Sequence, residues 1–215
     1  MSTPPADAPQ ALSPDVQALI APVHDAIEAA LAAQAKLPAP ADDHEALRRL
    51  GDLDKTAWGA LSHVDFANIP PDQKPQAKAQ IGVWIQFVDQ SNADGLIKIL
   101  PPEGWFAISR YGADGEDAAY RIVLHADIDT WRRFMPVVAR FAAIGEAKGE
   151  HYAFLSDRLA VHEGRPQNFG SQVNCVDGVY KPYPIVEPEA LDERRLSLHM
   201  PPYATFLKTL EGRRC

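Results

Sequence analysis

Cysteine is scarce in this chain, which holds only Cys175 and Cys215 among its 215 residues. Two cysteines cannot make the disulfide framework of a small secreted domain. No Cys-x-x-Cys pair or Cys/His cluster has the spacing of a structural zinc site. The low cysteine content is typical of a reducing compartment, so we expect a cytoplasmic location.

The chain also lacks a basic excess and long apolar runs. Acidic residues outnumber basic ones by 29 to 21, which gives a net charge of −8. This argues against nucleic-acid binding, because phosphate contacts need clustered Lys and Arg. No run has the length and apolarity of a membrane span, and the first ten residues do not have the pattern of a signal peptide. We expect a soluble protein with neither nucleic-acid nor membrane partners.

Common catalytic motifs are missing too. The sequence has no Walker-type glycine loop, no GxGxxG after a strand, no HExxH and no GxSxG. These absences argue against the common ATPase, dinucleotide-dependent reductase, zinc protease and α/β-hydrolase classes. Strands and helices do not alternate along the chain, so no parallel sheet is expected.

Proline, in contrast, is abundant. The chain has 19 prolines, about 9% of its residues against roughly 5% on average. In residues 1–11 they accompany Ala and Asp without apolar periodicity, which predicts a disordered tail. Elsewhere they stand mostly where helical segments start, bend or end. The pattern predicts a mainly α fold, a multi-helix bundle of short helices.

Residues 12–89 are predicted to form an N-terminal helical extension. Ser13-Pro14-Asp15 has the pattern of a helix start, Asp42 or Asp43 can cap a second helix, and Pro70-Pro71-Asp72 starts a third. Each segment carries apolar residues at helical spacing. A short fourth helix is expected over residues 94–100.

Residues 90–211 are predicted to form a second region that packs with the extension as one unit. Helices are expected after Asp114, from Asp129 or Thr130, and from Glu150 to His162. Asp177-Gly178 stands between β-branched and aromatic residues, which predicts one small β-hairpin near residues 172–182. Short helices follow from Pro188 and from Pro201-Pro202.

An ordered series of glycine and polar motifs runs through this second region. The motifs are Gly104-Trp105, His125-Ala126-Asp127, Asp157-Arg158, Gly164-Arg165-Pro166-Gln167 and Gly170-Ser171-Gln172. On these motifs the stretch from about Gln90 to Tyr203 resembles a mostly bacterial family, the domain of unknown function numbered 6624. The family usually has tyrosine where this chain has Phe169. The resemblance implies no established activity.

Three residues are candidate catalytic groups: His125, Asp127 and Asp157. A histidine can act as general base or metal ligand near neutral pH. Asp127 can converge with His125 only if the helix ends near His125, and it otherwise serves as a cap. Asp157 can orient the histidine, or it can pair with Arg194 for a structural purpose. A metal-binding variant would use His125 and Asp127 with a distant third ligand, so we assign no metal ligand and leave the cofactor unknown.

The candidate substrate-binding groups lie on or near the glycine-containing loop, and they are Arg158, Arg165, Gln167, Ser171 and Gln172. A guanidinium, carboxamides and a hydroxyl beside a glycine suit a small anionic or polar ligand. The alternative is that the amide side chains satisfy the loop's own backbone and join the hairpin to the helices.

Two functions follow from these candidates. The first is an enzyme, a hydrolase or group transferase, that acts on a small polar or anionic substrate with His125 as acid/base. The second is a non-catalytic interaction or regulatory module whose polar cluster is structural and whose N-terminal helices bind a partner or a second copy. The enzyme predicts a pocket at the cluster, and the module predicts an exposed apolar face on residues 14–88. Three further histidines of the second region, His151, His162 and His199, are expected at the surface.

Overall fold

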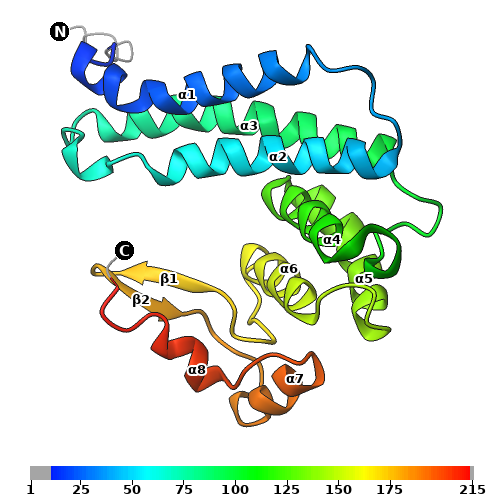
Figure 1. Ribbon diagram of the computed structural model, residues 1–215. Coiled ribbons are helices and arrows are strands. Elements are labelled where there is room, and N and C mark those ends of the chain that lie inside the picture. The colour runs from blue at the N-terminus through cyan, green and yellow to red at the C-terminus, as the bar shows by residue number, and fades with distance from the viewer. Residues whose placement is uncertain (1–10, 214–215) are drawn as a thin grey trace, which may run out of the picture. The chain divides into compact units, whose positions relative to one another are not determined.

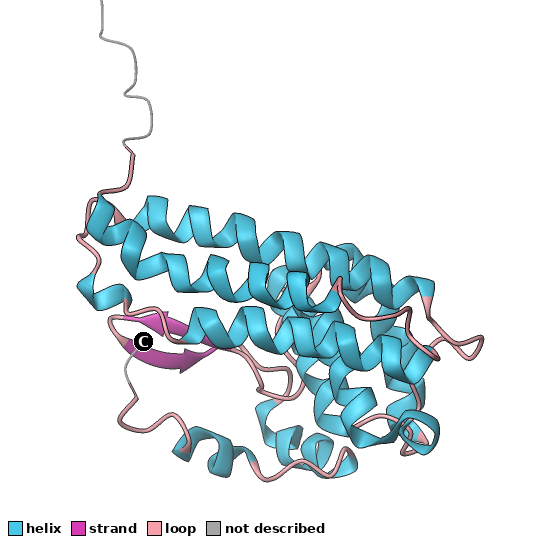
Figure 2. Cartoon of the chain, turned by 45° about the horizontal axis from the view of Figure 1, so that its top comes forward, coloured by secondary structure: helices cyan, strands magenta, loops and turns pink. Residues whose placement is uncertain are grey.

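The computed structural model describes residues 11–213, which form eight α-helices, two 3-10 helices and one two-stranded sheet (Figures 1 and 2). The predicted mainly α fold with one small hairpin is confirmed. The disordered tail expected over residues 1–11 lies outside the described residues, apart from residue 11. The chain divides into two compact units, Met1–Lys98 and Ile99–Cys215.

The N-terminal unit is a three-helix bundle of α1 (Pro14–Gln34), α2 (Asp43–Ser62) and α3 (Lys74–Lys98) (Figure 1). The short η1 (Phe66–Asn68) lies between α2 and α3. Two predicted caps are confirmed, since the side chains of Ser13 and Asp42 accept backbone N–H groups from the first turns of α1 and α2. All three helices contribute apolar residues to one core, including Val16, Ile20, Val23, Ile27, Leu53, Ala57, Ile81, Ile85 and Val88.

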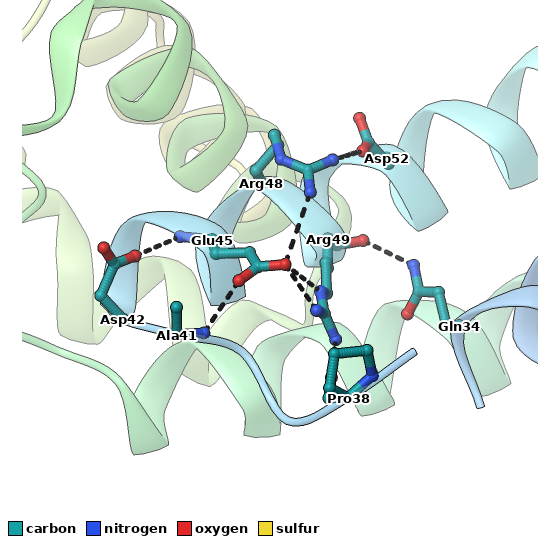
Figure 3. A network of polar contacts seen from close by, with 8 residues as sticks. All are labelled: Gln34, Pro38, Ala41, Asp42, Glu45, Arg48, Arg49 and Asp52. Atoms are coloured by element: carbon teal, nitrogen blue, oxygen red, sulfur yellow. Dashed lines mark hydrogen bonds and ion pairs between the residues drawn. The ribbon is translucent and has the colours of Figure 1, made fainter. Parts of the chain in front are cut away.

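Figure 3 shows how the proline-containing connection between α1 and α2 is fixed. The largely buried guanidinium of Arg49 donates to Glu45 Oε1 at 2.5 Å and to the Pro38 carbonyl at 2.8 Å. Glu45 Oε2 in turn accepts the Ala41 N–H at 2.8 Å. This hydrogen bond, followed by that from Arg49, lowers the pKa of Glu45. Gln34 completes the network by donating to the Arg49 carbonyl at 2.8 Å.

The separate helix expected over residues 94–100 is wrong, because α3 continues without a break to Lys98. Gly95 lies within this last part of the helix. A Cβ at that position would come within 2.8 Å of Leu50 Cδ2. The glycine therefore lets α2 and α3 approach closely, and it does not end the helix.

The C-terminal unit begins with α4 (Ile108–His125), α5 (Ile128–Ala143) and α6 (Gly149–His162). Helical structure starts before the predicted Asp114, and it is interrupted at Gly112, where φ is 71°. The cap of α5 is Asp127, two residues before the predicted start at Asp129.

The predicted hairpin follows α6 as β1 (Val173–Val176) and β2 (Val179–Pro182), drawn in magenta in Figure 2. Asp177 and Gly178 both have positive φ, as the tight turn of a two-residue hairpin requires. The described chain then continues through η2 (Pro188–Ala190), α7 (Leu191–Ser197) and α8 (Tyr203–Lys208).

Two findings bear on the expected location. Contrary to the sequence-based expectation, α1 is long and apolar enough to cross a membrane by length and composition. Its residues Val16, Ile20, Val23 and Ile27 are nevertheless buried in the bundle core. Cys175 is disulfide-bonded, so the low cysteine content does not by itself indicate a reducing compartment.

Candidate functional site

The buried carboxylate of Asp157 on α6 organises the loop between α6 and β1. Asp157 is 0% exposed. Its Oδ1 accepts the backbone N–H groups of Asn168 at 2.7 Å and Phe169 at 3.0 Å. Its Oδ2 accepts the backbone N–H and the hydroxyl of Ser171, both at 2.9 Å. Both carboxylate oxygens are therefore occupied by residues 168–171, which we call the anchored loop.

Two arginines of α7 hold the carbonyl groups of the anchored loop. Arg194 Nε donates to the Asn168 carbonyl at 2.9 Å. Arg195, which is 2% exposed, donates from Nη1 to the Phe169 carbonyl at 2.6 Å and from Nε to the Pro201 carbonyl at 2.8 Å. Burial lowers the pKa of Arg195. The link between Asp157 and α7 thus runs through the peptide groups of the anchored loop.

Gln167 joins the anchored loop to the strands. Its fully buried side chain donates from Nε2 to the carbonyls of Gln172 and Tyr183, each at 3.0 Å, and its Oε1 accepts the Gln172 N–H at 2.8 Å. The Gln172 amide donates to Ser171 Oγ at 3.1 Å. The structure therefore brings Asp157, Gln167, Ser171 and Gln172 together, with their side chains engaged by one another and by nearby backbone.

His125 and Asp127 stand at the junction of α4 and α5. His125 is the last residue of α4 and is half-buried, so the helix ends where convergence of the two residues requires it. Asp127, however, caps α5, with Oδ1 accepting the Thr130 N–H at 2.8 Å. This backbone hydrogen bond is the main reason that the pKa of Asp127 is lowered. Asp127 thus makes the contact expected of a helix cap.

Arg158 and Arg165 are engaged by other neighbours. The Arg158 guanidinium carbon lies 4.9 Å from the ring centroid of Trp131, within the range of a cation–π contact. Arg165 pairs with Glu163 at 2.5 Å, and its side chain is 56% exposed. Hydrogen bonds from Arg165 first, and then from Arg132, lower the pKa of Glu163.

A buried polar cluster between α4 and α6 was missed from the sequence. The expected surface position of His151 is wrong, since the residue is 5% exposed and its Nδ1 lies 2.9 Å from Oε2 of the fully buried Glu116. The ring stacks on Tyr120 with 3.7 Å between centroids, and burial raises the pKa of Tyr120. The i, i+4 spacing of Glu116 and Tyr120, which places them on one helix face, was the available signal.

A second missed cluster lies within the N-terminal unit. Trp58 Nε1 of α2 donates to Asp89 Oδ1 of α3 at 3.0 Å. Carboxylate oxygens of Asp54 and Asp89 lie within 4.8 Å of each other. Asp54 and Asn92 are each only 1% exposed. These polar residues stand among apolar residues at helical spacing in α2 and α3, and no local motif marks them.

The fold and the polar network define a mainly α protein with a three-helix bundle and a second unit of helices and one hairpin. The family of unknown function DUF6624 matches residues 68–214, and the chain belongs to this family. The match begins at residue 68 and therefore includes all of α3. The stretch that carries the sequence resemblance begins later, at about Gln90. No curated protein and no solved structure matches the chain.

Proposed function

We propose that the protein is a non-catalytic interaction module that self-associates through the outer face of α3. The observation that carries this proposal is the exposure of two large apolar side chains one turn apart, Val83 at 62% and Phe87 at 61%. The engagement of the polar cluster by the protein's own backbone also supports it. Asp157 and Gln167 would have to give up several buried hydrogen bonds to hold a substrate.

The outer face of α3 is apolar in the middle and carries almost no charge. A groove of about 500 Å³ runs along it. Its lining residues are Val83, Gln86, Phe87, Gln90, Ser91 and Asp94. The opposite face of α3 supplies Ile81, Ile85 and Val88 to the bundle core. The helix therefore presents apolar side chains on two sides, whereas a surface helix needs only one apolar stripe.

Charge favours a second copy of this chain as the occupant of the groove. Two copies that each carry a net charge of −8 repel over most of their surfaces. The outer face of α3 avoids this repulsion because Asp94 is the single acidic residue among those lining the groove. In an antiparallel pairing centred on Phe87, Asp94 lies opposite Gln80 of the partner subunit, whose amide can donate to it. Such a two-fold contact is self-complementary and closed.

The test is sedimentation equilibrium on the full chain, comparing wild type with Phe87→Gln and Val83→Gln. We expect a wild-type dimer at about 100 µM and a monomer for either variant, because each replaces an exposed apolar side chain at the centre of the contact. Ile144→Gln is the matched control, since Ile144 is 68% exposed on the other unit. A monomeric wild type, or dimers that persist in both α3 variants, would overturn the proposal.

We propose as a second candidate the enzyme with His125 as acid/base. Its support is that α4 ends at His125, which leaves this half-buried side chain at a helix terminus two residues before Asp127. The test is a thermal-shift screen of small anionic metabolites on wild type, His125→Ala and Arg165→Ala. A compound that stabilises wild type but neither variant supports a ligand-binding site that includes both residues, as the enzyme requires. Equal stabilisation of all three removes both residues from the site.

A further inference from the structure

We propose that Asp54, Asp89 and Asn92 form a binding site for a divalent cation of the Mg²⁺ class. All three residues belong to the N-terminal unit, on α2 and α3. The site is independent of the proposed self-association, because Asp54 and Asn92 are buried whereas the association face is exposed.

The register of α2 against α3 places the three side chains at neighbouring levels. Trp58 of α2 is hydrogen-bonded to Asp89 of α3. About two turns earlier on α2, Leu50 packs against Gly95, which lies later on α3. The two helices are therefore antiparallel, and the turns between these contacts carry Asp54 on α2 and Asn92 on α3.

Asn92 is the observation that points to a ligand. It is 1% exposed, and neither its Oδ1 nor its Nδ2 has a hydrogen-bond partner. A buried amide without partners is costly and uncommon in folded proteins. If Asn92 Oδ1 were a ligand to a cation, that oxygen would gain a partner. A water molecule bound to the cation would serve Oδ1 in the same way by donating a hydrogen bond.

The carboxylates supply the charge that the cation requires. Oxygens of Asp54 and Asp89 lie within 4.8 Å of each other. Two oxygens on opposite sides of Mg²⁺ stand about 4.2 Å apart, twice the usual Mg–O distance of about 2.1 Å. A divalent cation between the two carboxylates would be attracted to both of them.

The chemistry of the donor set selects the class of metal. Carboxylate and amide oxygens are hard ligands that suit Mg²⁺, Ca²⁺ and Mn²⁺ over softer metals. Three protein oxygens leave coordination positions for water, which Mg²⁺ commonly retains. The Trp58 N–H donates to Asp89 Oδ1 at 3.0 Å and so orients that carboxylate, as outer-shell partners do for metal ligands.

The experiment is a Mn²⁺ titration of the full chain after chelator treatment, followed by electron paramagnetic resonance, with Mg²⁺ as competitor. We expect one saturable Mn²⁺ per chain that Mg²⁺ displaces. Asp54→Asn and Asp89→Asn each remove one charged ligand and should weaken binding at least about tenfold. Asn92→Asp adds a charge and should strengthen binding by about tenfold.

Matched controls distinguish binding at this site from nonspecific binding of Mn²⁺ to surface carboxylates. Asp52→Asn makes the same change two residues from Asp54, at a side chain that is 52% exposed, and Asp25→Asn does so on α1 at 77% exposure. Both should leave Mn²⁺ affinity unchanged. Circular dichroism checks that each variant is folded. The proposal is overturned if wild type shows no saturable binding below about 1 mM, if the controls lose affinity equally, or if folded Asn92→Asp binds no tighter than wild type.

Discussion

The carboxylate of Asp157 accepts both the backbone N–H and the hydroxyl of Ser171, each at 2.9 Å. The same carboxylate binds the N–H groups of Asn168 and Phe169. It therefore caps a loop that follows it by 11 to 14 residues in the sequence. The polar side chains that suit a ligand are the same types that satisfy buried peptide groups, and here their contacts are with peptide groups and with one another.

Replacing Asp157 by Asn should destabilise the protein strongly. The amide has nearly the shape of the carboxylate, but it offers one acceptor oxygen where the anchored loop needs two, and its NH₂ group faces N–H donors. Buried donors left without acceptors predict a loss of about 3 kcal/mol in the free energy of unfolding, measured by urea denaturation at pH 7. Asp129→Asn, at a side chain that is 85% exposed, should change stability by less than about 0.5 kcal/mol. A loss below about 1 kcal/mol for Asp157→Asn would contradict the anchoring role.

Gln167→Glu tests the link from the anchored loop to the strands. The substitution removes two donors and sets a carboxylate against the carbonyls of Gln172 and Tyr183. We expect a loss of about 3 kcal/mol at pH 7. A buried carboxylate in such surroundings has a raised pKa, so the loss should shrink as the pH falls and the group takes up a proton. Gln172→Glu is the comparison, because the half-buried Gln172 side chain makes one hydrogen bond within residues 11–213, to Ser171 Oγ. Equal losses for the two variants at every pH would refute the argument.

Local sequence rules predicted the elements whose determinants are close in the chain. Ser13 and Asp42 cap helices because their side chains reach N–H groups three residues on. Asp177-Gly178 makes the hairpin because both positions require positive φ. The continuous α3 was not predictable in this way, since the space that Gly95 leaves for Leu50 depends on how α2 packs against α3.

The candidate site shows the same difference between local and long-range determinants. The sequence singled out Asp157, Gln167 and Ser171 as candidate site residues, in two separate polar clusters of the chain. It left open which donor meets which acceptor. The Arg195 contact with Phe169 spans 26 residues and the His151 contact with Glu116 spans 35. Pairings of this kind are set by the packing of α4, α6 and α7, and no local pattern encodes them.

Asp127→Ala should cost stability in a pH-dependent way. Removing the cap that accepts the Thr130 N–H predicts a loss of about 1 kcal/mol at pH 7. The pKa of Asp127 lies below its ordinary value of 3.8 in the folded protein. Its contribution is therefore fully present above the unfolded-state pKa and is lost as the pH falls through the lower folded-state pKa. Thermal unfolding of both proteins should thus give converging stabilities at the acid end of the range. A difference that stays constant down to about pH 2 would contradict the capping role.

Arg195 and Asp157 should be energetically coupled, because they hold the two sides of the same residue, Phe169. Arg195→Lys retains the charge but cannot reach both the Phe169 and Pro201 carbonyls with a fixed fork, so we expect a loss of about 2 kcal/mol. Arg195→Met should cost more, because two buried carbonyls lose their donor. In a double-mutant cycle with Asp157→Asn, the second substitution should cost less than in wild type, with a coupling of about 0.5 to 3 kcal/mol, since the anchored loop is already released. Urea denaturation of the four proteins measures this coupling. Strict additivity would mean that the two side chains stabilise the loop independently.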